Sequence, residues 1–124
     1  MAQFISFVGK EITQQEISLK QLLPGVDSGT VYQDIKANFM LGESRIAPNG
    51  TIPAHKGNQE SVFIVVTGSG TVFTESEDGE VLAQTAVKAG DVLLYTAPFF
   101  KHRYEAGDSG LAYMVVPVPK AKQE

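Results

Sequence analysis

Residues 54 to 70 read AHKGNQESVFIVVTGSG. The second half of this stretch, VFIVVTG at 62 to 68, is a continuous run of β-branched and aromatic residues. Such a run is typical of a strand that is buried on both faces. The first half places a histidine, a glutamine and a glutamate directly before that strand. Polar groups at the entrance of a core strand indicate either a binding site or the polar remainder of one.

The chain after residue 68 is also patterned as short strands separated by turns. The glycines of TGSGT at 67 to 71 predict a turn, and Asp78-Gly79 predicts a two-residue hairpin, because both positions of that turn need positive φ. The acidic run ESEDGE at 75 to 80 is interpreted as the solvated tip of this hairpin. Later strands are expected over 79 to 87, 91 to 98, 99 to 106 and 111 to 119, with a turn at 106 to 110.

The first forty residues are patterned less clearly. The spacing of apolar residues over 12 to 23 predicts a short helix, which Thr13 could cap together with Glu16. The rival interpretation is an irregular arm that ends at Pro24-Gly25. Residues 30 to 46 read as two strands. The pattern as a whole predicts an all-β sandwich or barrel. Its core would be filled by one set of apolar residues, or else by the residues that alternate with them along the strands. The set is Val62, Ile64, Val66, Val92, Leu94 and Val115.

Length and composition exclude several classes of protein. The chain has 124 residues and no dividing linker, so we expect one domain over 1 to 124, with its core at about 30 to 119 and an N-terminal arm at 1 to 29. It has no cysteine, and its net charge of −4 argues against nucleic-acid binding. Basic clusters occur only at 101 to 103 and 120 to 122. We find no leader and no membrane-spanning run, and therefore expect a cytoplasmic protein without membrane contact.

Two motifs in this order resemble those of the cupin superfamily, whose members are small jelly-roll barrels. The first comprises Gly50, His55, Glu60, Gly68 and Gly70, and the second comprises Gly90, Asp91, Pro98 and His102. The resemblance covers about residues 30 to 119. It implies a double-stranded β-helix of mostly antiparallel strands. The histidines fall at the two places where the superfamily carries ligands for a metal.

The resemblance implies a single divalent metal ion (iron, manganese, nickel or zinc) held by His55, Glu60 and His102. Two imidazoles and a carboxylate leave open positions for a substrate, as in non-haem iron sites. The chain departs from the motif, however, because Gly57 stands where a further histidine is expected. If His55 is counted as that histidine instead, Pro53 replaces the first one. Either way one of the superfamily's four ligands is missing.

The direction of Glu60 depends on the path of the chain before the core strand. Side chains alternate across a strand, so if Ser61 faces the barrel interior, Gln59 and Phe63 face it too and Glu60 points away. An inward Glu60 requires a bulge near 57 to 58, which glycine would permit. Gln59 is the alternative ligand if no bulge forms. The alternative to any site is that His55 is a residue of the barrel rim and His102 a hydrogen-bonded strand residue.

Aromatic residues close to His102 predict an apolar pocket. We expect the pocket to be lined by Ser61, Phe63, Phe100 and Tyr104. By alternation, Lys101 and Arg103 should lie in solvent on the opposite face. The alternation does not decide whether the remaining tyrosines point into the barrel or away from it. These are Tyr32, Tyr95 and Tyr113. Arg45 is expected to be exposed; an inward Arg45 that binds a carboxylate is the alternative.

These features leave more than one function open. The first hypothesis is a metal-dependent enzyme that acts on a small organic molecule as an isomerase, lyase or dioxygenase, with the metal as Lewis acid or oxygen activator. The alternative is a metal-free cupin that binds or senses a small molecule. A structural or assembly protein is the third hypothesis, in which both histidines would be dispensable. We also expect a homodimer in which residues 3 to 8, with Phe4, Ile5, Phe7 and Val8, contact the other chain.

Overall fold

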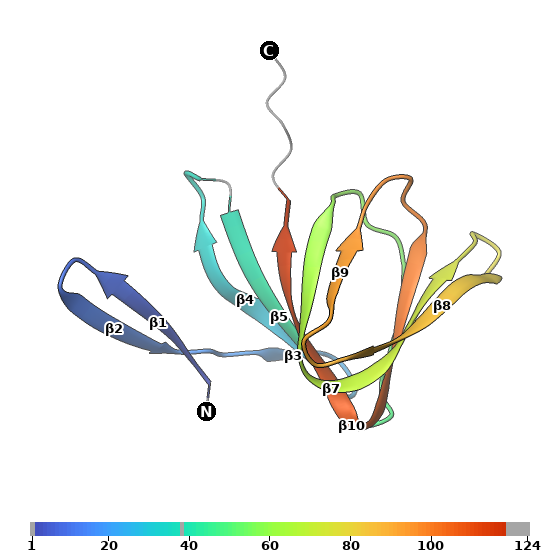
Figure 1. Ribbon diagram of the computed structural model, residues 1–124, viewed down its shortest axis with the longest axis horizontal. Helices are drawn as coiled ribbons and strands as arrows, with labels where there is room; N and C mark the ends of the chain where they lie inside the picture. Colours follow the sequence, from blue (N-terminus) through green and yellow to red (C-terminus); the bar gives the residue numbers. More distant parts are fainter. Residues whose placement is uncertain (1, 38, 119–124) are drawn as a thin grey trace, which may run out of the picture.

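The computed structural model describes residues 2 to 37 and 39 to 118. This part of the chain forms strands and contains no helix, which confirms the all-β prediction (Figure 1). The basic cluster at 120 to 122 lies outside the described residues. The strands are β1 (Gln3–Val8), β2 (Glu11–Glu16), β3 (Lys20–Leu23), β4 (Val26–Asp34), β5 (Phe39–Ile46), β6 (Thr51–His55), β7 (Ser61–Glu75), β8 (Val81–Lys88), β9 (Val92–Tyr95) and β10 (Lys101–Pro117).

Two long strands form the spine of the barrel. β7 and β10 pair with each other, and every other strand of the large sheet is arranged around them in the order β3-β4-β5-β10-β7-β8. β6 also pairs with β10, and β9 with β7. All these pairings are antiparallel. Both spine strands curve strongly, so that the sheet folds back over itself and encloses an interior (Figure 1).

Glycines form the bend in each spine strand, and this corrects the predicted turns at 67 to 71 and 106 to 110. β7 and β10 each continue through these residues. Their pairing shifts register between Ala106 and Leu111. Gly68 and Gly110 both have φ of 81°, and a Cβ on Gly68 would lie 2.0 Å from the Gly110 carbonyl oxygen. Only glycine permits two backbones to approach so closely, so these residues bend a continuous ladder instead of ending it.

The acidic hairpin differs from its prediction in two respects. Only Gly79 has positive φ, at 87°, so Asp78-Gly79 does not form a turn with two left-handed residues. The Ser76 amide instead donates to the Glu80 carbonyl, which closes a longer loop between β7 and β8. Glu75 is not part of the solvated tip: it ends β7 and is 8% exposed.

The predicted N-terminal helix is wrong, because residues 12 to 16 lie in β2 and residues 20 to 23 lie in β3. Ile12 is the register partner of Phe7, and Thr13 is the partner of Ser6. The ladder with β1 therefore satisfies the backbone groups that a helix would have paired internally. β1 and β2 form a hairpin that projects away from the barrel (Figure 1). No helix in the described part of the chain is long and apolar enough to span a membrane.

The core is filled mainly by the alternating neighbours of the named apolar set. Phe63 and Val65 are buried, whereas Ile64 is 37% exposed and Val66 is 39% exposed. On β9, Leu93 packs against the core, and Val92 and Leu94 are exposed. Val115 is the member of the named set that does pack against it. The run at 62 to 68 is therefore covered on one face only.

Candidate functional site

A cavity of about 320 Å³ opens inside the barrel. Its walls are mostly aromatic and aliphatic, with a few hydroxyl, amide and imidazole groups. Side chains from β3, β5, β6, β7, β9 and β10 contribute to it, together with the loop that precedes β7. It is lined by Leu22, Ser44, Ile52, His55, Gly57, Asn58, Gln59, Ser61, Phe63, Tyr95, His102, Tyr104, Tyr113 and Val115.

The structure brings the two histidines together at this cavity. His55 is the last residue of β6, and His102 lies near the start of β10, where the two are register partners. Their ring centroids are 4.3 Å apart with an interplanar angle of 44°. Residues distant in the sequence therefore meet because β6 and β10 pair antiparallel.

Hydrogen bonds orient both imidazoles through their Nδ1 atoms. His55 Nδ1 lies 3.0 Å from the Pro53 carbonyl oxygen. A carbonyl can only accept, so Nδ1 carries the proton and a neutral His55 keeps a lone pair on Nε2. His102 Nδ1 lies 2.5 Å from the hydroxyl of Tyr104, which is 4% exposed. Burial raises the pKa of Tyr104, so this phenol stays protonated.

His102 is held in its neutral form. Burial, and secondarily the neighbouring His55, lowers the pKa of His102 from 6.5 to about 4. The ring of Tyr95 stacks on the imidazole with centroids 4.1 Å apart and an interplanar angle of 14°. A neutral imidazole can serve as a hydrogen-bonding group or as a metal ligand.

Tyr95 also ties together two loops at the cavity, a role that the sequence analysis missed. Its hydroxyl donates to the Phe100 carbonyl at 2.6 Å and accepts from the Gly57 amide at 3.1 Å. A Cβ on Gly57 would lie 3.1 Å from the Tyr95 ring, so glycine allows the close approach. Gly57, the residue that departs from the superfamily motif, thus leaves room for the Tyr95 ring.

The loop before β7 places Gln59 at the cavity and Glu60 in solvent. Gln59 lines the cavity, and its amide nitrogen donates to the Val118 carbonyl at 3.3 Å. Glu60 is exposed and is not among the lining residues. This is the arrangement in which Ser61 faces inward. The described residues contain no group of three or more histidine, cysteine, aspartate or glutamate side chains that could hold a metal.

The other predicted pocket residues divide between the cavity and the surface. Ser61, Phe63 and Tyr104 line it, whereas Phe100 is 44% exposed and lies outside it, which corrects that prediction. Tyr113 also lines it, and burial raises the pKa of Tyr113 to about 12. Tyr32 instead stacks on Phe4, with centroids 5.2 Å apart.

Arg103 is on the predicted face but is not free in solvent. It forms ion pairs with Glu75 and with Glu105, the latter at 2.8 Å, and its guanidinium lies 3.8 Å from the centre of the Phe73 ring. The hydrogen bond to Glu75 is the main reason that the pKa of Arg103 is raised. Arg45 is exposed on the outside of β5, so the inward alternative is wrong.

The residues present fit part of the metal site that the cupin resemblance implies. His55 and His102 would supply two nitrogen ligands, each with Nδ1 held by a hydrogen bond, as ligating histidines usually are. Gln59 would supply a neutral amide oxygen as the third ligand. Glu60 does not fit, because its side chain is exposed outside the cavity.

Several solved structures have a similar architecture. The cupin domain of Drosophila melanogaster CENP-C is similar with a TM-score of 0.66 at 20% identity, over 83% of this chain and 76% of that one. KdgF from Halomonas sp. has a TM-score of 0.63 at 16% identity, over 83% of this chain and 90% of that one. The E162A mutant of Bacillus subtilis oxalate decarboxylase OxdC has a TM-score of 0.64 at 18% identity, over 78% of this chain and 26% of that one.

No family model and no curated protein matches the sequence. The structural likeness shows that the chain has the cupin fold, a jelly-roll barrel. Its neighbours include a protein named as a decarboxylase and a domain of CENP-C. The fold therefore does not choose a reaction, and function has to be argued from the cavity.

Proposed function

We propose that the protein binds a small, neutral, partly aromatic molecule in the barrel cavity, where His55 and His102 contact its polar group. The observation that carries this proposal is the convergence of two imidazoles on a cavity of about 320 Å³ with mostly apolar walls. This volume is at the lower end of the range for small-molecule sites. It suits a ligand of about one ring with a few substituents.

The chemistry of the walls supports a neutral ligand. The described residues that line the cavity include no aspartate, glutamate, lysine or arginine. A charged ligand would lose its hydration there without gaining a counter-ion. Hydroxyls of Ser44, Ser61 and Tyr113 and the imidazoles of both histidines offer hydrogen bonds to a phenol or a carbonyl. Phenols combine the aromatic body and the single polar group that these walls match.

Binding of phenol and of benzoate at pH 7 provides the test. We expect phenol to shift amide resonances of cavity residues in a saturable way, and benzoate to bind at least tenfold more weakly because its charge is uncompensated. His55→Ala and His102→Ala should each weaken phenol binding, whereas Phe100→Ala, outside the cavity, should not. Equal phenol affinity in wild type and both histidine variants would contradict the proposal.

A second candidate function is metal-dependent catalysis on such a molecule. It is favoured by the two Nδ1 hydrogen bonds. The Pro53 carbonyl leaves the Nε2 lone pair of His55 for a metal, and Nε2 of His102 is available in the tautomer whose Nδ1 donates to the Tyr104 hydroxyl. When bound, the metal would act as a Lewis acid toward the polar group of the ligand. His55, His102 and Gln59 would hold it, and the aromatic walls would orient the substrate.

Elemental analysis separates the two candidates. Protein purified without a histidine tag should contain about one transition metal per chain if the second candidate is correct, and His55→Ala and His102→Ala should lose it. Wild type without metal that binds phenol would support the first candidate alone.

A further inference from the structure

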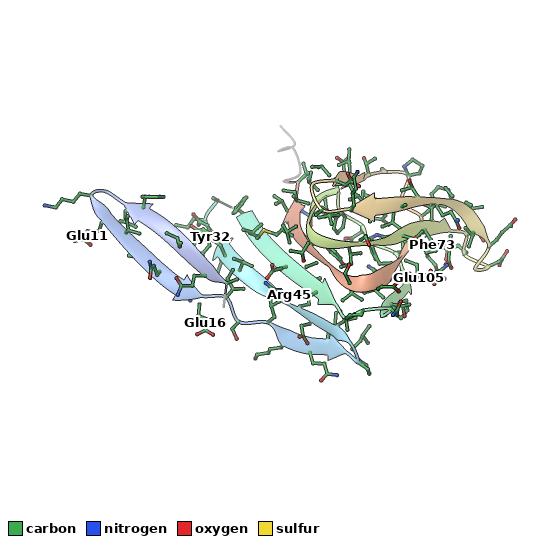
Figure 2. All side chains as sticks on the ribbon, turned by 60° about the horizontal axis from the view of Figure 1, so that its bottom comes forward. Glu11, Glu16, Tyr32, Arg45, Phe73 and Glu105 are labelled. Carbon is green, nitrogen blue, oxygen red and sulfur yellow. The ribbon has the colours of Figure 1, made fainter. Side chains whose placement is uncertain are left out.

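A second cavity lies on the outer face of β5, on the opposite side of the strand from the barrel cavity. Ser44 lines the barrel cavity, so its neighbours Glu43 and Arg45 face the other way. In Figure 2, Arg45 lies between the β1–β2 hairpin and the part of the barrel that carries Phe73 and Glu105. This outer cavity has a volume of about 230 Å³ and is lined by Ala2, Ile17, Leu19, Asp27, Glu43 and Arg45.

The chain that leads from the hairpin to β3 covers the outer cavity. It crosses the sheet at Gly29, where a Cβ would lie 3.1 Å from the Ser18 carbonyl oxygen and 3.3 Å from a methyl carbon of Leu19. Gly29 is the register partner of Glu43. The missing side chain thus lets residues 18 and 19 lie against the sheet beside Glu43. As a result the Glu43 side chain is 6% exposed.

Glu43 is only partly satisfied in this position. Its Oε1 accepts from Arg45 Nη2 at 3.5 Å, a long contact to a side chain that is itself 51% exposed. Its Oε2 is buried and has no hydrogen-bond partner among the described residues. Buried carboxylate oxygens nearly always have partners. A donor on a molecule inside the outer cavity would supply the missing bond.

The charges of the outer cavity define what this molecule should be. Asp27, the register partner of Arg45, and Glu43 bring two negative charges, and Arg45 brings one positive charge. The balance of one negative charge matches a monovalent cation. A divalent metal is disfavoured, because the described residues hold no group of three metal-ligating side chains and the guanidinium repels it. Ile17 and Leu19 add an apolar wall beside the carboxylates.

We propose that the outer cavity binds a primary alkylammonium group. Its N–H groups donate to Glu43 Oε2 and to the Asp27 carboxylate, and its hydrocarbon part packs on Ile17 and Leu19. This site is separate from the barrel cavity and does not depend on the function proposed for it.

The test uses n-butylammonium chloride as the probe, compared with sodium chloride and tetramethylammonium chloride at equal ionic strength. We expect n-butylammonium to raise the thermal midpoint saturably and to shift amide resonances of residues 17 to 19, 27 to 29 and 43 to 45. Tetramethylammonium has the same charge but no N–H group, so it should act like sodium. Amides near the two histidines should not respond.

Substitution of the buried carboxylate supplies the control. Glu43→Gln keeps the size of the side chain and should weaken n-butylammonium binding at least tenfold, and Asp27→Asn should weaken it less. Glu11→Gln removes an exposed carboxylate at the hairpin and should change nothing. The proposal is overturned if wild type responds equally to all three salts, which would mean that the cavity holds water only. An n-butylammonium affinity that is unchanged in the folded Glu43→Gln variant would overturn it too.

Discussion

His102 shows how aromatic surroundings control one polar group. Tyr95 stacks on its ring, Phe63 contacts it edge-on with centroids 6.1 Å apart, and Tyr104 bonds its Nδ1. These neighbours replace water around the imidazole without offering a carboxylate to stabilise a positive charge. The neutral form is therefore favoured, and both proposed roles of His102 use that form.

Stability should fall as the medium becomes acidic because of His102. Its pKa of about 4 in the folded state lies below the value of about 6.5 for an unfolded histidine. Between these values the unfolded chain binds a proton that the folded chain does not. The contribution of His102 to the free energy of unfolding is thus fully present above about pH 6.5 and is lost as the pH falls toward 4. We expect a slope of up to about 1.4 kcal/mol per pH unit, measured by urea unfolding with EDTA present.

The matched variant for this measurement is His102→Gln. Acidic residues that titrate in the same range affect wild type and variant alike, so their difference isolates the imidazole. The difference should decrease from pH 7 to pH 5. A difference that does not vary with pH over this range would mean that His102 titrates normally in the folded protein.

At the scale of the strand, β7 shows that burial is decided by the sheet and not by residue type. Val65 and Val66 are identical in chemistry and adjacent in sequence, yet Val65 is 3% exposed and Val66 is 39% exposed. Successive side chains on a strand point to opposite faces, and only one face of β7 meets the core.

Truncation of these two valines should therefore have unequal effects. Val65→Ala removes two buried methyl groups and should lower the free energy of unfolding by about 2 kcal/mol. Val66→Ala should change it by about 0.5 kcal/mol or less. Denaturant unfolding of both variants checks this, and equal losses would show that both faces of β7 are covered in solution.

The bend of β7 should be intolerant of a side chain. Gly68→Ala adds a Cβ in the left-handed region and against the Gly110 carbonyl, so we expect a loss of about 3 kcal/mol or more. Gly79 has a similar φ of 87°, but a Cβ there would meet no atom within 4 Å. Gly79→Ala should cost only about 1 kcal/mol. Thermal unfolding of the pair separates the clash from the backbone conformation, and similar losses would argue that β7 and β10 are less closely packed.

At the scale of the molecule, the β1–β2 hairpin is a separate two-stranded sheet that leaves large apolar side chains exposed. Phe7 is 80% exposed and its register partner Ile12 is 61% exposed, so the two place apolar surface on one face of a two-stranded sheet. A hairpin of two strands is marginally stable alone in water. A second copy of the chain would cover this surface, as expected for residues 3 to 8.

We predict a homodimer that depends on the hairpin. Phe7→Ser should shift the mass measured by light scattering from dimer to monomer. Ile35→Ser, which removes an 84% exposed residue beyond β4, should leave the dimer intact. A wild-type protein that is monomeric at all concentrations would refute the prediction.

The sequence by itself determined the all-β class, the cupin fold and the identity of the two histidines that meet. Apolar runs, glycines and two motifs are local signals, and they survive without knowledge of distant contacts. The sequence did not determine which face of β7 is buried, because both faces carry large apolar residues and only the packed sheet distinguishes them. Nor did it predict the β1–β2 hairpin, where pairing of Ile12 with Phe7 outweighs a helical spacing.

Only the tertiary structure decided the composition of the site. The direction of Glu60 depends on the phase of a short loop, and that loop is tied by the Tyr95 hydroxyl from a strand about forty residues later. The bends of β7 and β10 were each predicted as a turn, because glycine permits both, and the choice depends on the strand that pairs alongside. The burial of Glu43 depends on residues 18 and 19, which cover it from a distant part of the chain. In each case the deciding contact joins segments that are remote in the chain, so no local pattern could contain it.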